Sequence, residues 1–195
     1  DGVHSYGLIA HTAEYQFWRE FSVQVVVHPT GRGPPSKPQM QVLMTKPGAW
    51  RLLLSETGVP AFEVVFEGQQ EQREEAATVR AVGTEALALG LTYVVKATCR
   101  DGAVKLHVCE VTNEDVDGAD GPELLTHRCN MRMVGAAKAT SPSAKLVNNT
   151  ASIIVGAGSV GAAGAGRGAA AEVESGFIGA LEELYLSKIS LEDAQ

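Results

Sequence analysis

Residues 91–111 (LTYVVKATCRDGAVKLHVCEV) contain two runs in which apolar and polar side chains alternate, separated by Asp101-Gly102. An Asp-Gly pair between such runs predicts a β-hairpin, because both turn positions need a positive φ. A two-residue turn here gives one apolar face with the pairs Cys99–Val104, Ala97–Leu106 and Val95–Val108. The other face is predicted to be exposed to solvent and carries the pairs Arg100–Ala103, Thr98–Lys105 and Lys96–His107.

Several other short segments show the same alternation. Gly, Pro or charged residues bound each of them, as is typical of β-strands. The predicted strands cover 21–27, 40–44, 50–55, 62–66 and 78–82, with two or three more within 124–134 and 145–155. Segments 50–55 and 62–66 are predicted to form a second hairpin, and the inward set of the 40–44 strand is predicted to be Met40, Val42 and Met44. Many short strands with almost no helical period predict an all-β fold, a two-sheet antiparallel jelly-roll sandwich.

The segment GALEELYLSKI near the C-terminus fits two patterns. One face of a helix would carry Leu181, Leu184, Tyr185 and Lys188. A strand through Leu181 to Leu186 fits the sheet instead, and we predict the strand. Residues 190–193 have the spacing of a helix-capping box and predict a short final turn.

A length of 195 residues allows one large β domain or two small ones, and we predict a single domain over residues 1–195. The 45% hydrophobic and 20% charged residues are ordinary for a soluble globular domain. Two segments within it are predicted to be loops: the acidic residues 112–123 and the flexible, Gly/Ala-rich residues 156–171. The net charge of −7 argues against nucleic acid or an anionic membrane as a partner. No apolar run approaches the roughly 18 residues that a membrane span needs, so we expect no membrane insertion.

The three cysteines bear on the compartment. In the predicted hairpin Cys99 faces the core and Cys109 the opposite side, so these two cannot bond to each other, whereas Cys129 can pair with either. An unpaired cysteine slightly favours an intracellular, reducing location. The sequon Asn148-Asn149-Thr150 favours a secreted one, and the localisation stays open.

The order of these segments resembles the laminin-G-like domains of the concanavalin-A-like lectin/glucanase superfamily. The resemblance runs from FSVQVVVHPT through both hairpins and SIIVGAG to the C-terminal segment. Members often close with a strand of the form F-x-G-x-I-x-x-L-x-I and a turn rich in Leu, Ser, Asp and Ala. The matching positions here are Phe177, Gly179, Leu181, Leu184 and Leu186, followed by Ser190 to Ala194. The resemblance implies a jelly roll with a curved face and a loop rim where ligands often sit.

This chain departs from the family pattern after the middle hairpin. Many members have an aspartate-glycine pair there, where this chain has Cys109-Glu110 and the acidic insertion. The acids of a calcium-binding rim have no clear counterpart. The departure counts against calcium-dependent recognition.

Two motifs suggest ligands that their surroundings do not support. Gly156, Gly158 and Gly161 match the spacing of a dinucleotide-binding turn, but the tract that follows is too rich in glycine for a helix and no parallel strand follows. Asn113, Asp115, Asp117 and Gly118 match the first half of a calcium loop, but the twelfth position is Leu124, with Glu123 one residue early. We predict neither site.

Other candidate residues have simpler structural explanations. None of the five histidines has metal-ligand spacing with a cysteine: His4, His11, His28, His107 and His127. Trp18 and Trp50 suit a buried core better than a sugar-stacking platform. Glu63 and Glu67 share a face, but they do not form the E-x-D-x-x-E string of the superfamily glucanases and are predicted to lie on a plain solvent-exposed face.

We therefore predict a non-catalytic binding module of a larger protein, for protein interaction or carbohydrate recognition. It is expected to have no catalytic residue, cofactor or metal, and to bind a protein or a glycan. Two alternatives stay open: a structural packing domain of an intracellular assembly, and a degenerate glycosidase-like enzyme. The sequence does not name the ligand-binding residues.

Overall fold

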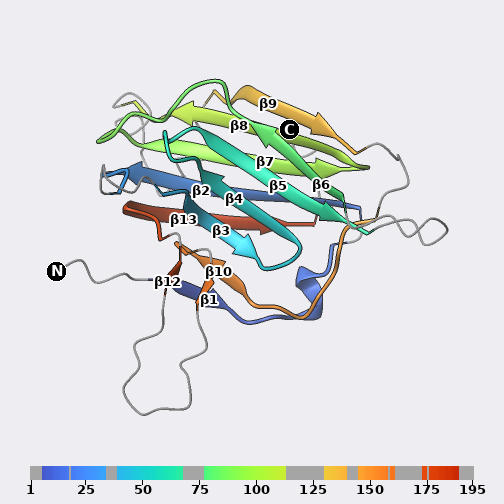
Figure 1. The fold of residues 1–195 in the computed structure, drawn as a ribbon. Helices are drawn as coiled ribbons and strands as arrows, with labels where there is room; N and C mark the ends of the chain where they lie inside the picture. The colour runs from blue at the N-terminus through green and yellow to red at the C-terminus, as the bar shows by residue number, and fades with distance from the viewer. Residues whose placement is uncertain are drawn as a thin grey trace, which may run out of the picture.

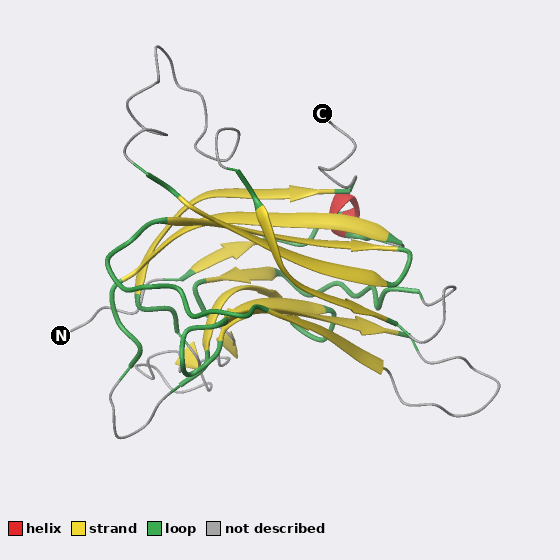
Figure 2. Ribbon diagram, turned by 90° about the horizontal axis from the view of Figure 1, so that it is seen from above, coloured by secondary structure: helices red, strands yellow, loops and turns green. Residues whose placement is uncertain are grey.

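The computed structural model describes residues 6–17, 19–33, 39–67, 77–112, 130–139, 145–157, 159–160, 173–174 and 176–188. These residues form two large antiparallel sheets stacked face to face (Figures 1 and 2). The six-stranded sheet contains, in spatial order, β1 (Gly7–Ile9), β10 (Ile153–Val155), β3 (Gln41–Lys46), β4 (Trp50–Leu54), β5 (Pro60–Phe66) and β6 (Ala77–Val82). The five-stranded sheet contains β13 (Gly179–Ser187), β2 (Glu20–Pro29), β7 (Tyr93–Arg100), β8 (Ala103–Glu110) and β9 (Arg132–Lys138). The predicted two-sheet sandwich is confirmed.

Three short elements complete the described structure. A 3-10 turn, η1 (Ala13–Tyr15), precedes β2, and β11 (Ser159–Val160) pairs antiparallel with β12 (Val173–Glu174). Most of the predicted loops 112–123 and 156–171 lie outside the described residues, as does the predicted turn at 190–193.

The hairpin of β7 and β8 has the predicted register. Cys99 pairs with Val104, Ala97 with Leu106 and Val95 with Val108. Asp101 and Gly102 have φ values of 47° and 77°, as the two-residue turn requires. The alternation and the turn specify the same pairing, so the sequence determines this part of the sheet.

The inner faces of the two sheets enclose one large hydrophobic core. Its centre is an aromatic cluster in which Phe21 of β2 contacts Trp50 of β4 and Phe62 of β5, with ring centroids 5.6 and 5.9 Å apart. Phe17 stacks on Phe21 at 4.9 Å. These rings join the sheets, and they confirm Trp50 as a core residue; Trp18 lies outside the described residues.

The predicted inward set of β3 is wrong at two of its three positions, because Met40 and Val42 both pack outside the main core. The register shifts between Val42 and Met44, so that Leu43 is an extra residue opposite β4. Leu43 and Met44 both join the main core, whereas Val42 lies in a separate small cluster with Leu53 and Ala61. A β-bulge changes which side of the strand faces inward, and simple alternation does not reveal it.

The outer face of the β7–β8 hairpin is less exposed than predicted. Arg100 is exposed, but Thr98 is buried and Lys96, Lys105 and His107 are half-buried. Thr98 lies between Ser22 of β2 and Lys105 of β8 in the register. Neighbouring strands lie on both sides of the hairpin, and the aliphatic stems of the lysine side chains cover part of its outer face. This face is therefore less exposed than the alternation alone predicts.

The C-terminal segment is the predicted strand and not a helix. β13 pairs antiparallel with β2 along its length, with a register shift between Glu182 and Tyr185. Glu183, within this shift, has a φ of 45°. Leu181 and Leu186 both pack against the main core although they are five residues apart, because the register shift between them changes which side of the strand faces inward.

Candidate functional site

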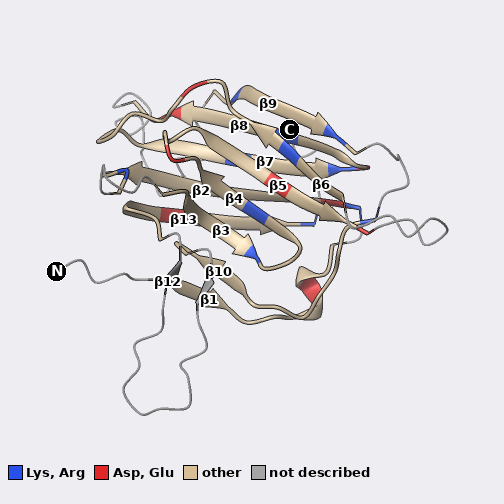
Figure 3. Ribbon diagram, viewed as in Figure 1, with Lys and Arg blue, Asp and Glu red and all other residues tan. Residues whose placement is uncertain are grey.

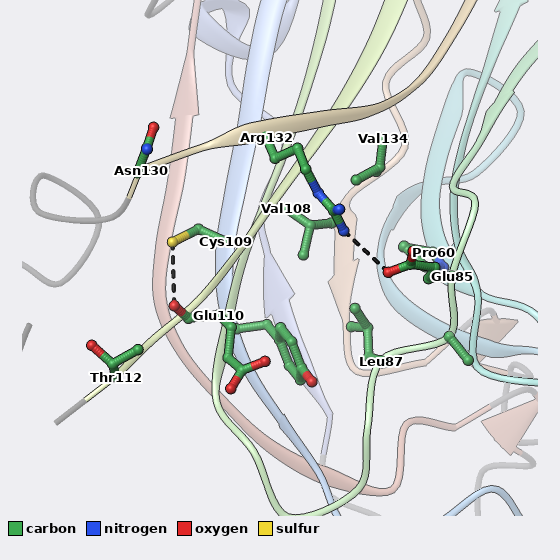
Figure 4. Close-up of a pocket in the computed structure, with 12 residues that line it drawn as sticks. Pro60, Glu85, Leu87, Val108, Cys109, Glu110, Thr112, Asn130, Arg132 and Val134 are labelled. Atoms are coloured by element: carbon green, nitrogen blue, oxygen red, sulfur yellow. Dashed lines mark hydrogen bonds and ion pairs between the residues drawn. The ribbon is translucent and has the colours of Figure 1, made fainter.

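A pocket of about 560 Å³ lies at one end of the sandwich, where strands of both sheets meet (Figure 4). Its walls come from the start of β5, the β6–β7 loop (residues 83–92), the start of β7, the end of β8 and the start of β9. We call it the end pocket. Its volume lies within the usual range of small-ligand sites.

The floor of the end pocket is mostly aliphatic. The apolar lining residues are Pro60, Ala86, Leu87, Tyr93, Val108 and Val134. Leu87 and Tyr93 are buried, whereas Ala86 on the loop is exposed. Tyr93 presents little of its ring, because it is only 7% exposed and its hydroxyl oxygen accepts a hydrogen bond from the Ala88 N–H at 3.1 Å.

The β6–β7 loop is held in place by hydrogen bonds from its own backbone. The N–H groups of Gly83, Leu87 and Gly90 donate to the carbonyl oxygens of Pro60, Gly58 and Pro29 at 2.8, 3.0 and 2.8 Å. The Arg32 guanidinium also donates to the Leu87 carbonyl oxygen. These bonds fix the loop to two other segments, residues 58–60 and 29–32, and so hold the pocket wall in place.

Polar and charged side chains surround the mouth of the pocket. They are Glu85, Glu110, Thr112, Asn130 and Arg132, all exposed. Arg132 of β9 forms an ion pair with Glu85 of the loop at 3.1 Å, across the mouth (Figure 4). Both side chains are about two-thirds exposed, at 67% and 71%, so this pair contributes little to stability and can be exchanged for contacts with a ligand.

Cys109 lines the same pocket and is disulfide-bonded, to a partner outside the described residues. Its sulfur lies 3.3 Å from the carbonyl oxygen of Glu110. A disulfide sulfur has no proton to donate, so this is a close sulfur–oxygen contact and not a hydrogen bond. Cys99 is free and buried in the core, where burial raises the pKa of its thiol to about 12, and the charge of Asp101 adds to this.

Glu63 does not lie on a plain solvent-exposed face, contrary to prediction. Its side chain is only 8% exposed and forms ion pairs with Arg51 of β4 and Arg80 of β6, the latter at 3.2 Å. Figure 3 shows these three charges side by side across β4, β5 and β6. Glu67 is exposed and follows the end of β5. Neither residue lines the end pocket.

The other sequence candidates are not brought together. Ile153–Val155 of the glycine motif is β10, which is antiparallel to both β1 and β3, so the motif has no parallel-strand context. The residues that match the first half of a calcium loop lie outside the described residues, as do His4 and His127. Among the residues that the structure describes, no group of three or more His, Cys, Asp or Glu side chains is placed to hold a metal ion. No helix in this part of the chain is long and apolar enough to span a membrane.

Neither a family model nor a curated protein matches the chain by sequence. Solved structures match its fold. Domains LG4–5 of the mouse laminin α1 chain superimpose with a TM-score of 0.54 at 15% identity, over 93% of this chain and 40% of that one. The LG1–3 region of the laminin α2 chain gives 0.52 at 12% identity, over 94% and 30%. The chain therefore has the fold of these laminin G domains.

The same fold also occurs in an enzymatic domain. The enzymatically active domain of tailspike protein 2 from bacteriophage CBA120 matches with a TM-score of 0.54 at 12% identity, over 96% of this chain and 24% of that one. The present chain therefore spans 40% or less of the solved structures described here. A shared fold does not decide between binding and catalysis, so function has to be argued from the site.

Sequence reasoning did not find the end pocket. Glu85 and Arg132 are separated by 47 residues, and no spacing pattern links them. The only signal was indirect: the laminin-G-like resemblance implied a ligand site on the loop rim, and the end pocket lies where loops and strand ends meet.

Proposed function

We propose that this domain is a non-catalytic binding module of a larger protein and that the end pocket holds its ligand. The observation that carries the proposal is the pocket itself: an aliphatic floor from both sheets beneath a ring of exposed polar side chains. Ligand sites are usually concave and combine apolar surface with placed polar groups, and here six of the twelve lining residues are apolar and six are polar. The hydrogen-bonded β6–β7 loop supports it further, because a preformed wall lowers the entropy cost of binding.

The charged groups support binding over catalysis. A glycosidase needs two carboxyl groups flanking the scissile bond, with pKa values that their surroundings push apart. Of the two carboxylates that line the pocket, Glu85 is largely exposed and ion-paired with Arg132, and Glu110 is exposed to solvent. Glu63 is held between two arginines away from the pocket. These environments suit orientation and stability better than proton transfer.

The test is ligand screening with a pocket-filling variant. Wild-type protein, Ala86→Trp and Ala88→Trp are compared on a glycan array and a peptide library. Both alanines are exposed on the same loop, but only Ala86 lines the pocket. We expect ligands that bind wild type and Ala88→Trp and fail to bind Ala86→Trp. Equal binding by all three proteins would place the ligand elsewhere, and cleavage of a bound oligosaccharide would overturn the non-catalytic assignment.

A further inference from the structure

We infer that the ligand of the end pocket is a polypeptide segment of a partner protein, with an aliphatic side chain next to a lysine or arginine. This inference rests on the proposed binding function and specifies its ligand. It depends on three features of the pocket: the aliphatic residues of its floor, the scarcity of exposed aromatic surface among its lining residues, and the sign of its net charge.

The floor offers aliphatic contact and almost no aromatic surface. Sugar rings are commonly bound by stacking on an exposed aromatic face, since one side of the ring is apolar. The only aromatic residue among those that line the pocket is Tyr93, which is 7% exposed and whose hydroxyl is already bonded to the loop. Ala86, which is exposed, and Val108 and Val134, which are half-buried, instead provide an aliphatic surface that fits Leu, Ile or Val. This favours a peptide over a glycan.

The charges at the mouth favour a cation. Glu85 and Glu110 contribute two negative charges and Arg132 one positive charge, so the lining carries a net charge of −1. An anionic ligand group would have to compete with Glu85 for Arg132 and would lie near Glu110. A cationic group is attracted by both carboxylates, and the net charge of −7 of the whole chain adds a long-range attraction.

The ion pair across the mouth allows a test in which the two signs of ligand charge predict opposite results. Arg132 holds the Glu85 carboxylate at 3.1 Å. Removing the arginine frees this carboxylate and removes a repelling charge, so Arg132→Ala strengthens binding of a basic peptide. The same variant weakens binding of an acidic peptide or a sulfated glycan.

The experiment is panning of a phage-displayed random heptapeptide library, followed by calorimetry with one enriched synthetic peptide. We expect enriched sequences with Leu, Ile or Val beside Lys or Arg. Glu85→Lys should weaken this peptide on the order of tenfold, equivalent to about 1.4 kcal/mol. Glu14→Lys is the control, because it makes the same charge change at an exposed site on η1 that does not line the pocket. Near-UV circular dichroism confirms that each variant is folded.

Several outcomes would overturn the inference. Enrichment of acidic peptides, or weaker binding by Arg132→Ala, would contradict the predicted ligand charge. A glycan that binds wild type and fails on Ala86→Trp, with no peptide enriched, would contradict the polypeptide ligand and leave the binding function standing. Absence of any ligand that distinguishes Ala86→Trp from Ala88→Trp, on both the array and the library, would instead overturn the proposed function.

Discussion

Gly135 lies where the outer strands of the two sheets come closest. A Cβ atom added to this residue of β9 would lie 2.4 Å from the carbonyl oxygen of Val82 in β6 and 2.8 Å from its carbonyl carbon. Backbone atoms within a paired strand cannot move aside as a side-chain tip can. Only glycine therefore allows β6 and β9 to close this side of the sandwich, next to the end pocket.

Replacing Gly135 tests this close approach. Gly135→Ala is expected to lower the free energy of unfolding by about 1–3 kcal/mol, the usual cost of overpacking. Urea denaturation followed by circular dichroism measures it. Gly7→Ala in β1 is the matched control, because its Cβ would meet Val155 at an ordinary 3.5 Å. Equal stability of the two variants would mean that β6 and β9 separate at little cost.

Lys46 is a buried base at the end of β3. The residue is 2% exposed, and its Nζ donates a hydrogen bond to the carbonyl oxygen of Tyr15 at 2.8 Å. Burial lowers the pKa of its ammonium group below the ordinary value of 10.5. The folded protein therefore holds this proton less tightly than the unfolded chain, so unfolding takes up a proton between the lowered pKa and 10.5.

The consequence is a pH dependence of stability with a defined sign. Through that window the contribution of Lys46 to the free energy of unfolding rises with pH, because the cost of burying the charge disappears. Lys46→Met lacks this cost at every pH. We expect its stability relative to wild type to be greatest near neutral pH and to shrink as the pH approaches 10.5, measured by urea denaturation at a series of pH values. Parallel stability curves would show that Lys46 does not titrate in this range.

At the scale of elements, ion pairs between side chains connect three neighbouring strands on the outer face of the six-stranded sheet. Arg51 of β4, Glu63 of β5 and Arg80 of β6 lie opposite one another in the register. The carboxylate accepts a hydrogen bond from Arg51, forms an ion pair with Arg80 and is largely shielded, whereas each arginine side chain is 46% exposed. Cross-strand pairs of this kind stabilise the register of neighbouring strands.

This network should matter more than the ion pair at the pocket mouth. Glu63→Gln is expected to cost about 1 kcal/mol of unfolding free energy, since both arginines lose their partner beside a shielded site. Glu85→Gln breaks a pair that is about two-thirds exposed on both sides and should cost less than about 0.5 kcal/mol. Thermal denaturation of the two variants compares them. A larger cost for Glu85→Gln would contradict this ranking.

The sequence predicted elements well wherever local signals agreed. The β7–β8 hairpin was correct to the residue, because the alternation of the strands and the positive-φ turn at Asp101-Gly102 imply the same pairing. The prediction for β3 failed at Met40 and Val42, because an extra residue in one strand follows from its pairing with β4 and leaves no mark in the strand itself. The burial of Glu63 was missed for a similar reason, since its two arginines come from other strands.

The candidate site was less predictable than the fold. Its floor and mouth combine Pro60, residues 85–87, Val108 and Arg132, which only the packing of the two sheets brings together. Each of these residues is unremarkable in its own segment. A pocket formed by strand ends depends on how the strands are ordered in the two sheets. A single sequence indicates that order only when it resembles a known family.

At the scale of the molecule, both sheets combine early and late parts of the chain. β10 lies between β1 and β3 in the six-stranded sheet, and β13 pairs with β2 in the five-stranded one (Figure 1). The apolar residues Phe177, Leu181 and Leu186 of the late segment pack against the core. Neither sheet is complete without residues from both halves.

Truncation of the chain tests this dependence. A chain ending after residue 175 lacks β13, leaves the backbone of β2 unpaired on one side and uncovers the core. We expect it to lose cooperative unfolding and the near-UV circular dichroism of a packed core. The control ends after residue 188 and keeps every described strand. Cooperative unfolding of the shorter chain would show that β13 is dispensable for the fold.

The pairing of β2 with β13 also affects how the protein is made. β13 leaves the ribosome about 150 residues after β2, which takes roughly 10–30 s at usual elongation rates. Throughout that interval the nascent chain presents a long Val-rich strand edge with no partner, a surface prone to aggregation. We expect the domain to depend on chaperones during translation until β13 has left the ribosome and paired with β2. Slower translation should increase this dependence.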